Sequence, residues 1–145
     1  MLQPSRTKYR KAHRGIIKGL AIRGSEVSFG DYALKTIESG YITSRQIESA
    51  RKAIVRFLKK GGQVWIRIFP DKPYTKKALE VPMGGGKGGV EMYRAPVKPG
   101  RILFEMGDIA PEIAREALTL ASYKLPVKTK ILMAKDELYE GNPTI

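Results

Sequence analysis

The stretch "ITSRQIESARKAIVRFLKKGG" (residues 42–62) constrains the fold most, because it carries every signal of one complete amphipathic helix. Thr43 and Gln46 have the spacing of a capping box, and two glycines at 61 and 62 end the pattern. Apolar residues at helical spacing form one face that we expect to pack on a core: Ile47, Ala50, Ile54, Phe57 and Leu58.

The opposite side of this helix gathers cations. At 100° per residue, it holds Arg45, Lys52, Arg56, Lys59 and Lys60. A charged outer face is usually only solvated, but these charges share one sign and Glu48 alone opposes them. We therefore expect this face to contact phosphates.

Short strands and a second helix are predicted for the rest of the chain. Residues 63–70, 101–107 and 127–133 alternate as strands do, and 74–81 and 90–97 are weaker candidates. "PEIAREALTLASYKL" predicts a helix from Pro111, with an inner face of Ile113, Ala114, Ala117, Leu118, Ala121 and Leu125. Without regular strand-helix alternation, this order predicts an α+β sandwich, with two helices on a mostly antiparallel or mixed sheet.

The charge is concentrated in the first 89 residues. The chain has 27 Lys and Arg against 14 Asp and Glu, a formal charge of +13 that exceeds what solubility requires. Residues 1–25 contain no acid, whereas residues 90–145 are balanced. We expect residues 1–25 to be an extended basic arm that becomes ordered on a polyanion. The alternative is a disordered solvated tail, but Ile16, Ile17 and Leu20 among the charges argue against it.

Composition also restricts the class of protein. The chain has no cysteine, so disulfides and thiolate metal sites are excluded. It shows no signal-peptide pattern and no apolar run of membrane-spanning length, so we expect an intracellular protein without membrane association. A length of 145 residues favours one domain over residues 26–133 beside the arm, followed by a polar tail at 134–145 without an assigned role.

The glycine-rich stretch "PMGGGKGG" (residues 82–89) raises the question of nucleotide binding. Gly84, Gly86 and Gly89 match the spacing of a dinucleotide fingerprint, but the following residues favour a strand where that motif needs a helix. A P-loop is absent because Gly88 follows Lys87 where Ser or Thr is required. Nucleotide binding remains the alternative interpretation of this loop.

No catalytic residue, metal site or cofactor is predicted. His13 is the only histidine and lies in the basic arm, so histidine-based catalytic sites and most transition-metal sites lack their partners. Asp108 and Glu112 are paired acids, but they lie at a predicted helix start, where the helix dipole favours acids. We expect a binding protein, not an enzyme.

A series of motifs in chain order resembles the bacterial-type large-subunit ribosomal protein L-sixteen family. The blocks are "MLQPSRTKYRKAHRG", "SFGDYALK", "ITSRQIESARKAI", "VWIRIFPDKP", "MGGGKG", "KPGRILFEM" and "AREAL...A..KLPVKT". They cover residues 1–133. The resemblance implies an α/β hammerhead-like sandwich in cytoplasmic or organellar ribosomes, next to other large-subunit proteins, that joins the large subunit late in assembly.

The resemblance also assigns binding residues. It implies that the arm and the basic helix bind large-subunit rRNA, and charge extends this set to Arg6, Lys8, Arg10, Lys11, His13, Arg14, Lys18, Arg23, Arg45, Arg51, Lys52, Arg56, Lys59 and Lys60. It further implies that the glycine loop approaches tRNA near the peptidyl-transferase centre through Met83, Gly84, Gly85, Gly86, Lys87 and Gly88. Many family members carry an arginine where this chain has Pro82, so we expect the loop to rely more on Lys87.

Overall fold

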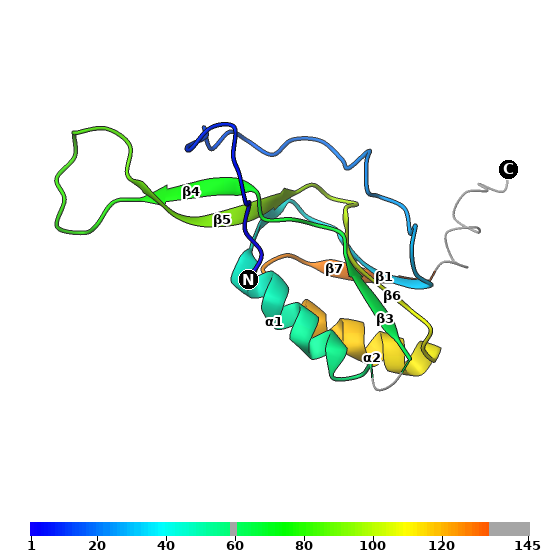
Figure 1. Cartoon of the computed structure of the whole chain (residues 1–145). Helices are drawn as coiled ribbons and strands as arrows, with labels where there is room; N and C mark the ends of the chain where they lie inside the picture. Colours follow the sequence, from blue (N-terminus) through cyan, green and yellow to red (C-terminus); the bar gives the residue numbers. More distant parts are fainter. Residues whose placement is uncertain (59–60, 134–145) are drawn as a thin grey trace, which may run out of the picture.

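The computed structural model describes residues 1–58 and 61–133 of the chain (Figure 1). Within these ranges it forms two helices and seven strands. In chain order they are β1 (Tyr32–Thr36), β2 (Gly40–Thr43), α1 (Ser44–Val55), β3 (Gln63–Ile66), β4 (Lys72–Lys76), β5 (Gly89–Val97), β6 (Ile102–Gly107), α2 (Pro111–Ser122) and β7 (Thr129–Met133). The predicted tail at 134–145 lies outside the described residues.

The strands form two antiparallel sheets. One has the order β3-β6-β1-β7 and the other β2-β5-β4. The α+β prediction is confirmed, with two sheets where one was expected. Sequence analysis missed β1 and β2, although β1 is central and pairs with both β6 and β7. These strands are only five and four residues long and are separated by a turn, so periodicity over so few residues carries little signal.

Helix α1 begins as predicted and ends early. Its capping box is present, since the Gln46 amide N–H donates to Thr43 Oγ1 (3.2 Å) and the Thr43 N–H donates to Gln46 Oε1 (2.9 Å). The prediction that the glycines end the helix is wrong, because it stops at Val55. The Leu58 N–H bonds to the carbonyl of Val55, three residues back, and the Leu58 side chain folds against Gly62. This tighter turn lets Leu58 pack on the core.

Helix α2 lies beside α1, and both cover the same side of the sheets (Figure 1). Four residues of its predicted inner face are fully buried: Ala114, Ala117, Leu118 and Ala121. Ile113 was wrongly assigned to this face, because its side chain is 40% exposed. At 100° per residue, Ile113 lies at the edge of the alanine stripe, and the small alanines bring the helix close enough to leave it outside.

The main core lies between the helices and both sheets. It joins apolar residues from every layer, among them Leu34, Ile54, Val97, Phe104 and Leu118. A second, smaller cluster of Ala33, Ile102 and Leu132 is packed with Val27 from the N-terminal segment. Residues before β1 therefore contribute to both clusters, since Leu2 packs on the main core and Val27 on the smaller one.

The buried carboxylate of Glu105 on β6 connects this strand both to Arg67, which follows β3, and to the N-terminal segment. The Glu105 carboxylate is fully buried and accepts a hydrogen bond from Arg67 (3.0 Å). Its other oxygen accepts from the backbone N–H groups of Ser28 (2.8 Å) and Phe29 (3.2 Å). These partners replace the water that a buried carboxylate loses, so residues 26–29 are held against the sheet.

Candidate nucleic-acid interface

Residues 1–31 contain no helix or strand. The chain begins beside α1, where Leu2 packs on the main core, and then runs along the side of the sheets that the helices leave open (Figure 1). Three backbone hydrogen bonds hold this N-terminal segment. The Ala21 N–H donates to the Pro99 carbonyl (2.9 Å), the Ile102 N–H donates to the Gly24 carbonyl (2.8 Å), and the Asp31 N–H donates to the Met106 carbonyl (2.8 Å). The segment thus follows a defined path over the body. Its ordering by a partner stays a prediction, as does its separation from the domain.

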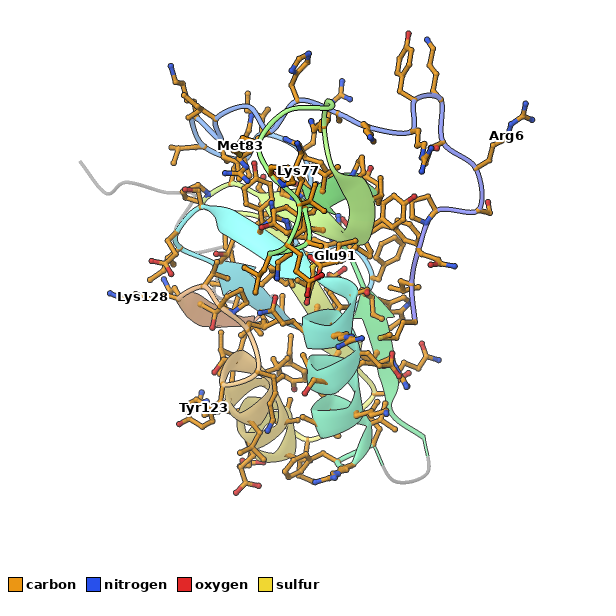
Figure 2. All side chains as sticks on the ribbon, turned by 90° about the vertical axis from the view of Figure 1, so that its left-hand side faces the viewer. Arg6, Lys77, Met83, Glu91, Tyr123 and Lys128 are labelled. Atoms are coloured by element: carbon orange, nitrogen blue, oxygen red, sulfur yellow. The ribbon has the colours of Figure 1, made fainter. Side chains whose placement is uncertain are left out.

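The predicted cations of this segment face outward. Seven of the eight side chains are exposed and Lys11 is half-buried: Arg6, Lys8, Arg10, Lys11, His13, Arg14, Lys18 and Arg23. Figure 2 shows Arg6 projecting away from the body. Among residues 1–58 and 61–133, none of these side chains makes an ion pair. Their charge is available to an external anion.

Two tyrosines enclose an arginine on the outer face of the three-stranded sheet. The Arg94 guanidinium carbon is 4.2 Å from the ring centroid of Tyr41 on β2 and 4.0 Å from that of Tyr74 on β4. Lys72 lies over the Tyr41 ring (5.5 Å) and Arg14 over the Tyr74 ring (5.9 Å). We call these five residues the tyrosine–arginine stack.

Sequence analysis missed the stack, because it depends on strand register. Arg94 is aligned with Thr43 on one side and Lys72 on the other, and the tyrosines lie one pleat away on the same face. The available signal was weak, because β4 and β5 were marginal candidates and β2 was not predicted.

The N-terminal segment also contacts the loop between β4 and β5. The Lys87 ammonium donates to the carbonyl of Ala12 (2.5 Å), and the Lys11 ammonium donates to the carbonyl of Lys87 (2.9 Å). The two segments are 75 residues apart in sequence. The predicted rRNA-binding arm and the predicted tRNA-proximal loop are therefore adjacent in the fold.

The glycine loop lies at the far end of the β4–β5 hairpin (Figure 1). Gly84, Gly85 and Gly86 have φ values of 113°, 75° and 93°, and a Cβ at any of them would meet no atom within 4 Å. Glycine is therefore required here for backbone conformation and not for close packing within the chain. Strand β5 follows at Gly89, so the helix that a dinucleotide fingerprint needs is not formed.

The predicted cations of α1 lie on the helix side of the molecule. Arg45, Lys52 and Arg56 are exposed, while Lys59 and Lys60 lie outside the described residues. The structure therefore separates the predicted rRNA-binding residues into two groups, one on α1 and one along the N-terminal segment.

Arg51 on α1 is already paired. It donates two hydrogen bonds to Glu48 (3.0 and 2.5 Å), which lower the pKa of that carboxyl below its ordinary value of 4.5. Glu48 raises the pKa of Arg51 in return. The contribution of the pair to stability is present above the ordinary pKa and is lost as the pH falls through the lowered one. Arg51 is thus less available to RNA than its neighbours.

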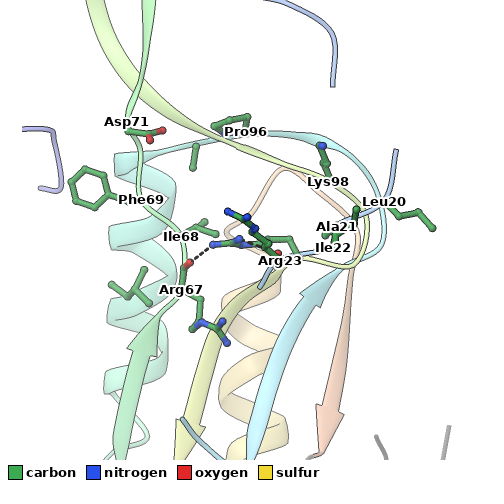
Figure 3. A pocket seen from close by; sticks show the side chains of 13 residues that line it. Leu20, Ala21, Ile22, Arg23, Arg67, Ile68, Phe69, Asp71, Pro96 and Lys98 are labelled. Atoms are coloured by element: carbon green, nitrogen blue, oxygen red, sulfur yellow. Dashed lines mark hydrogen bonds between the residues drawn. The ribbon is translucent and has the colours of Figure 1, made fainter. Parts of the chain in front are cut away.

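A groove of about 860 Å³ opens where residues 20–23 pass over the sheets. Figure 3 shows Leu20 and Phe69 at its two sides. Arg101 lines the groove and donates to the carbonyls of Arg23 (3.1 Å) and Arg67 (2.8 Å). Burial lowers the pKa of the Arg101 guanidinium, and the nearby charge of Arg67 lowers it further. Arg101 therefore holds the path of the chain from inside the groove.

The described part of the chain contains no group of three or more His, Asp or Glu side chains arranged to hold a metal ion. Within residues 1–58 and 61–133, neither helix has the length and apolar character needed to cross a bilayer.

Comparison with known proteins identifies the family. The family model "Ribosomal protein L16p/L10e" matches residues 4–132. The chain belongs to this family. It is 54% identical over 137 residues to the "Large ribosomal subunit protein uL16" of Trichodesmium erythraeum (strain IMS101), an alignment that covers 94% of this chain and all of that protein. The predicted resemblance is confirmed over nearly the range expected from the motifs.

Proposed function

We propose that this chain is a structural, non-catalytic component of the large ribosomal subunit in the cytoplasm and that it binds large-subunit rRNA. One observation carries the proposal. Residues 1–25 carry seven Lys and Arg side chains, six of them exposed, and none has an acid partner among the described residues. Such a row of cations binds an RNA backbone by neutralising phosphates and releasing counterions. The family of the chain agrees with this chemistry.

In this proposal the two cationic groups contact different parts of the subunit. The exposed face of α1 lies on the helix side of the sheets, whereas the N-terminal segment starts beside α1 and then follows the opposite side, so one straight RNA helix does not follow both along their length. The protein therefore joins separate rRNA segments, with neighbouring ribosomal proteins beside it. Such a role suits a component that is added late, when both segments are in place.

The glycine loop gives the second part of the proposal. Its exposed, nearly side-chain-free backbone reaches beyond the body. In this proposal the exposed Lys87 side chain meets a phosphate of tRNA. In the free chain the Lys87 ammonium is hydrogen-bonded to the Ala12 carbonyl. Contact with tRNA would exchange this carbonyl for a phosphate oxygen, which is a stronger, charge-assisted acceptor.

Sedimentation tests the first part. Cells that express a tagged copy are lysed and fractionated on a sucrose gradient, and the tagged chain is expected with large subunits and whole ribosomes. Arg10→Glu and Arg14→Glu reverse exposed arm charges and are expected to reduce this incorporation, while Arg115→Glu on α2 serves as the control. Absence of the wild-type chain from large subunits would reject the proposal.

A tRNA accommodation assay on purified ribosomes tests the second part. Lys87→Glu is expected to leave incorporation nearly unchanged and to slow accommodation. Lys77→Glu is the matched control, because Lys77 lies in the same loop and its ammonium donates to a loop carbonyl, that of Gly84 (2.8 Å). Equal effects of the two variants, or a failure of Lys87→Glu to enter subunits, would contradict the assigned division of roles.

A further inference from the structure

We propose that the tyrosine–arginine stack is a binding site for a backbone phosphate of RNA, with Arg94 as its central donor and Lys72 and Arg14 beside it. The inference rests on the proposed function and extends it. Neither Arg94 nor Lys72 is among the rRNA-binding residues expected from charge pattern or family resemblance.

The two tyrosine rings hold the Arg94 guanidinium so that its in-plane N–H groups stay open to a ligand. The guanidinium lies 4.2 Å and 4.0 Å from two tyrosine ring centroids, so aromatic rings flank it. A guanidinium held in this way cannot also stack on a nucleobase, and its in-plane N–H groups are what remains for a ligand. Paired N–H groups in one plane match two oxygens of a phosphate. The rings thus prepare Arg94 for a phosphate.

Arg94 has no acceptor of its own. In the described part of the chain, no carboxylate or carbonyl accepts a hydrogen bond from its guanidinium, although the side chain is half-buried. Lys72 is used in part, because its ammonium donates to the carbonyl of Arg14. A half-buried guanidinium with open donors gains more from an anion than an exposed lysine does, since less water competes for it.

The charges of the stack also require an anion. Three cations surround two tyrosine rings, and none of the three makes an ion pair among residues 1–58 and 61–133. Like charges this close raise each other's electrostatic energy, and a bound anion removes that penalty.

RNA is the anion that the surroundings favour. The stack lies under the N-terminal segment, whose first 25 residues contain seven cations and no acid. The Tyr41 hydroxyl donates to the carbonyl of Arg14 (3.1 Å), so this segment and the stack form one continuous surface. A polymer with regularly spaced phosphates can engage both at once, whereas a single protein carboxylate engages one.

A purely structural role makes a different prediction. If the stack only anchors Arg14 of the N-terminal segment, neutralising Arg94 lowers the melting temperature and leaves the salt dependence of RNA binding unchanged. If the stack binds a phosphate, a variant with neutral residue 94 releases one counterion fewer than the wild type when it binds RNA. Its slope of log K against log salt concentration is then shallower.

The experiment measures binding of the full-length chain to large-subunit rRNA transcribed in vitro, over a series of salt concentrations. Arg94→Gln and Arg94→Met, which keeps an apolar stem between the rings, are expected to reduce the slope by about 0.7 to 0.9. Arg94→Lys retains the charge and is expected to retain the slope with weaker binding, because the planar fork is lost. Circular dichroism confirms that each variant is folded.

Arg115→Gln is the matched control, since it removes one exposed arginine from α2. The proposal is overturned if Arg94→Gln and Arg94→Met both have the same salt-dependence slope as Arg115→Gln. Normal rRNA binding by Arg94→Gln with reduced incorporation into large subunits would also overturn it, because the stack would then meet a protein acid. Repeating the series with purified tRNA shows which RNA supplies the phosphate. If the wild-type chain fails to bind rRNA, the proposed function fails as well.

Discussion

The body of this molecule and its cationic layer are stabilised by different interactions. The body consists of α1, α2 and the four-stranded sheet, and its core residues are fully buried. The cationic layer consists of residues 1–25, the outer face of the three-stranded sheet and the loop at 77–88. It is held by single hydrogen bonds to carbonyls and by cation–π contacts. Burial stabilises the body without a partner, whereas the layer has charges that only a partner neutralises.

This difference separates folding from binding. Apolar burial depends little on salt, while contacts between exposed charged groups are screened at physiological ionic strength. Substitutions in the body should therefore change the free energy of unfolding, and substitutions in the layer should change RNA affinity. The predictions below test this separation, beginning with the largest effect.

Removing the Phe104 side chain should have the largest effect. Phe104 on β6 is fully buried in the main core, so Phe104→Ala loses its burial and leaves a cavity. We expect unfolding to become easier by about 3–5 kcal/mol, measured by urea denaturation. Leu79→Ala is the control, because Leu79 is fully exposed in the hairpin loop and should change stability by less than about 0.5 kcal/mol. Similar losses for both would mean that the layer belongs to the same cooperative core.

Glu105→Gln tests how residues 26–29, which follow the N-terminal part of the layer in the chain, are held on the body. The substitution removes the charge that the half-buried Arg67 faces, while the amide oxygen can still accept from the Ser28 N–H. We expect a loss of about 3 kcal/mol in denaturation experiments, at the lower end for a broken buried pair. Glu91→Gln on β5 is exposed and should be nearly neutral. A neutral Glu105→Gln would show that hydrogen bonds, and not charge, hold residues 26–29.

Thr43→Ala removes the side-chain half of the α1 capping box. The Gln46 N–H then loses its acceptor, and we expect a loss of about 1 kcal/mol in the free energy of unfolding. Ser49→Ala, at an exposed position within α1, is the control and should not destabilise the protein. A cap without effect would indicate that packing alone determines where α1 begins.

Lys87→Gln should have the smallest effect on stability. It removes an exposed hydrogen bond to Ala12, so we expect a change below about 0.5 kcal/mol. Amide hydrogen exchange should nevertheless become faster around residues 11–14 and 84–88, and Lys77→Gln should leave residues 11–14 unchanged. Protection that stays the same in Lys87→Gln would show that other contacts hold the segment against the loop.

Local features of this chain could be predicted from its sequence. The capping box, the inner stripe of α1 and the start of α2 at Pro111 depend on residues a few positions apart, so their patterns are visible without the fold. The early end of α1 was missed, because the packing of Leu58 against Gly62 and the core opposes the glycine stop signal. The charge of residues 1–25 predicts a polyanionic partner, and this stays a prediction.

The arrangement of the cationic layer depends on residues far apart in sequence. Tyr41, Tyr74 and Arg94 meet because β2, β5 and β4 pair in one register, and a shift of one residue would turn Arg94 to the other face. Lys87 reaches Ala12 only after the hairpin and the N-terminal segment have been placed by the body. The signals that begin a helix act through hydrogen bonds within one turn, so a short sequence pattern contains them. The contacts of Arg94 and Lys87 need sheet pairing and loop closure between distant parts of the chain, and no short pattern encodes these.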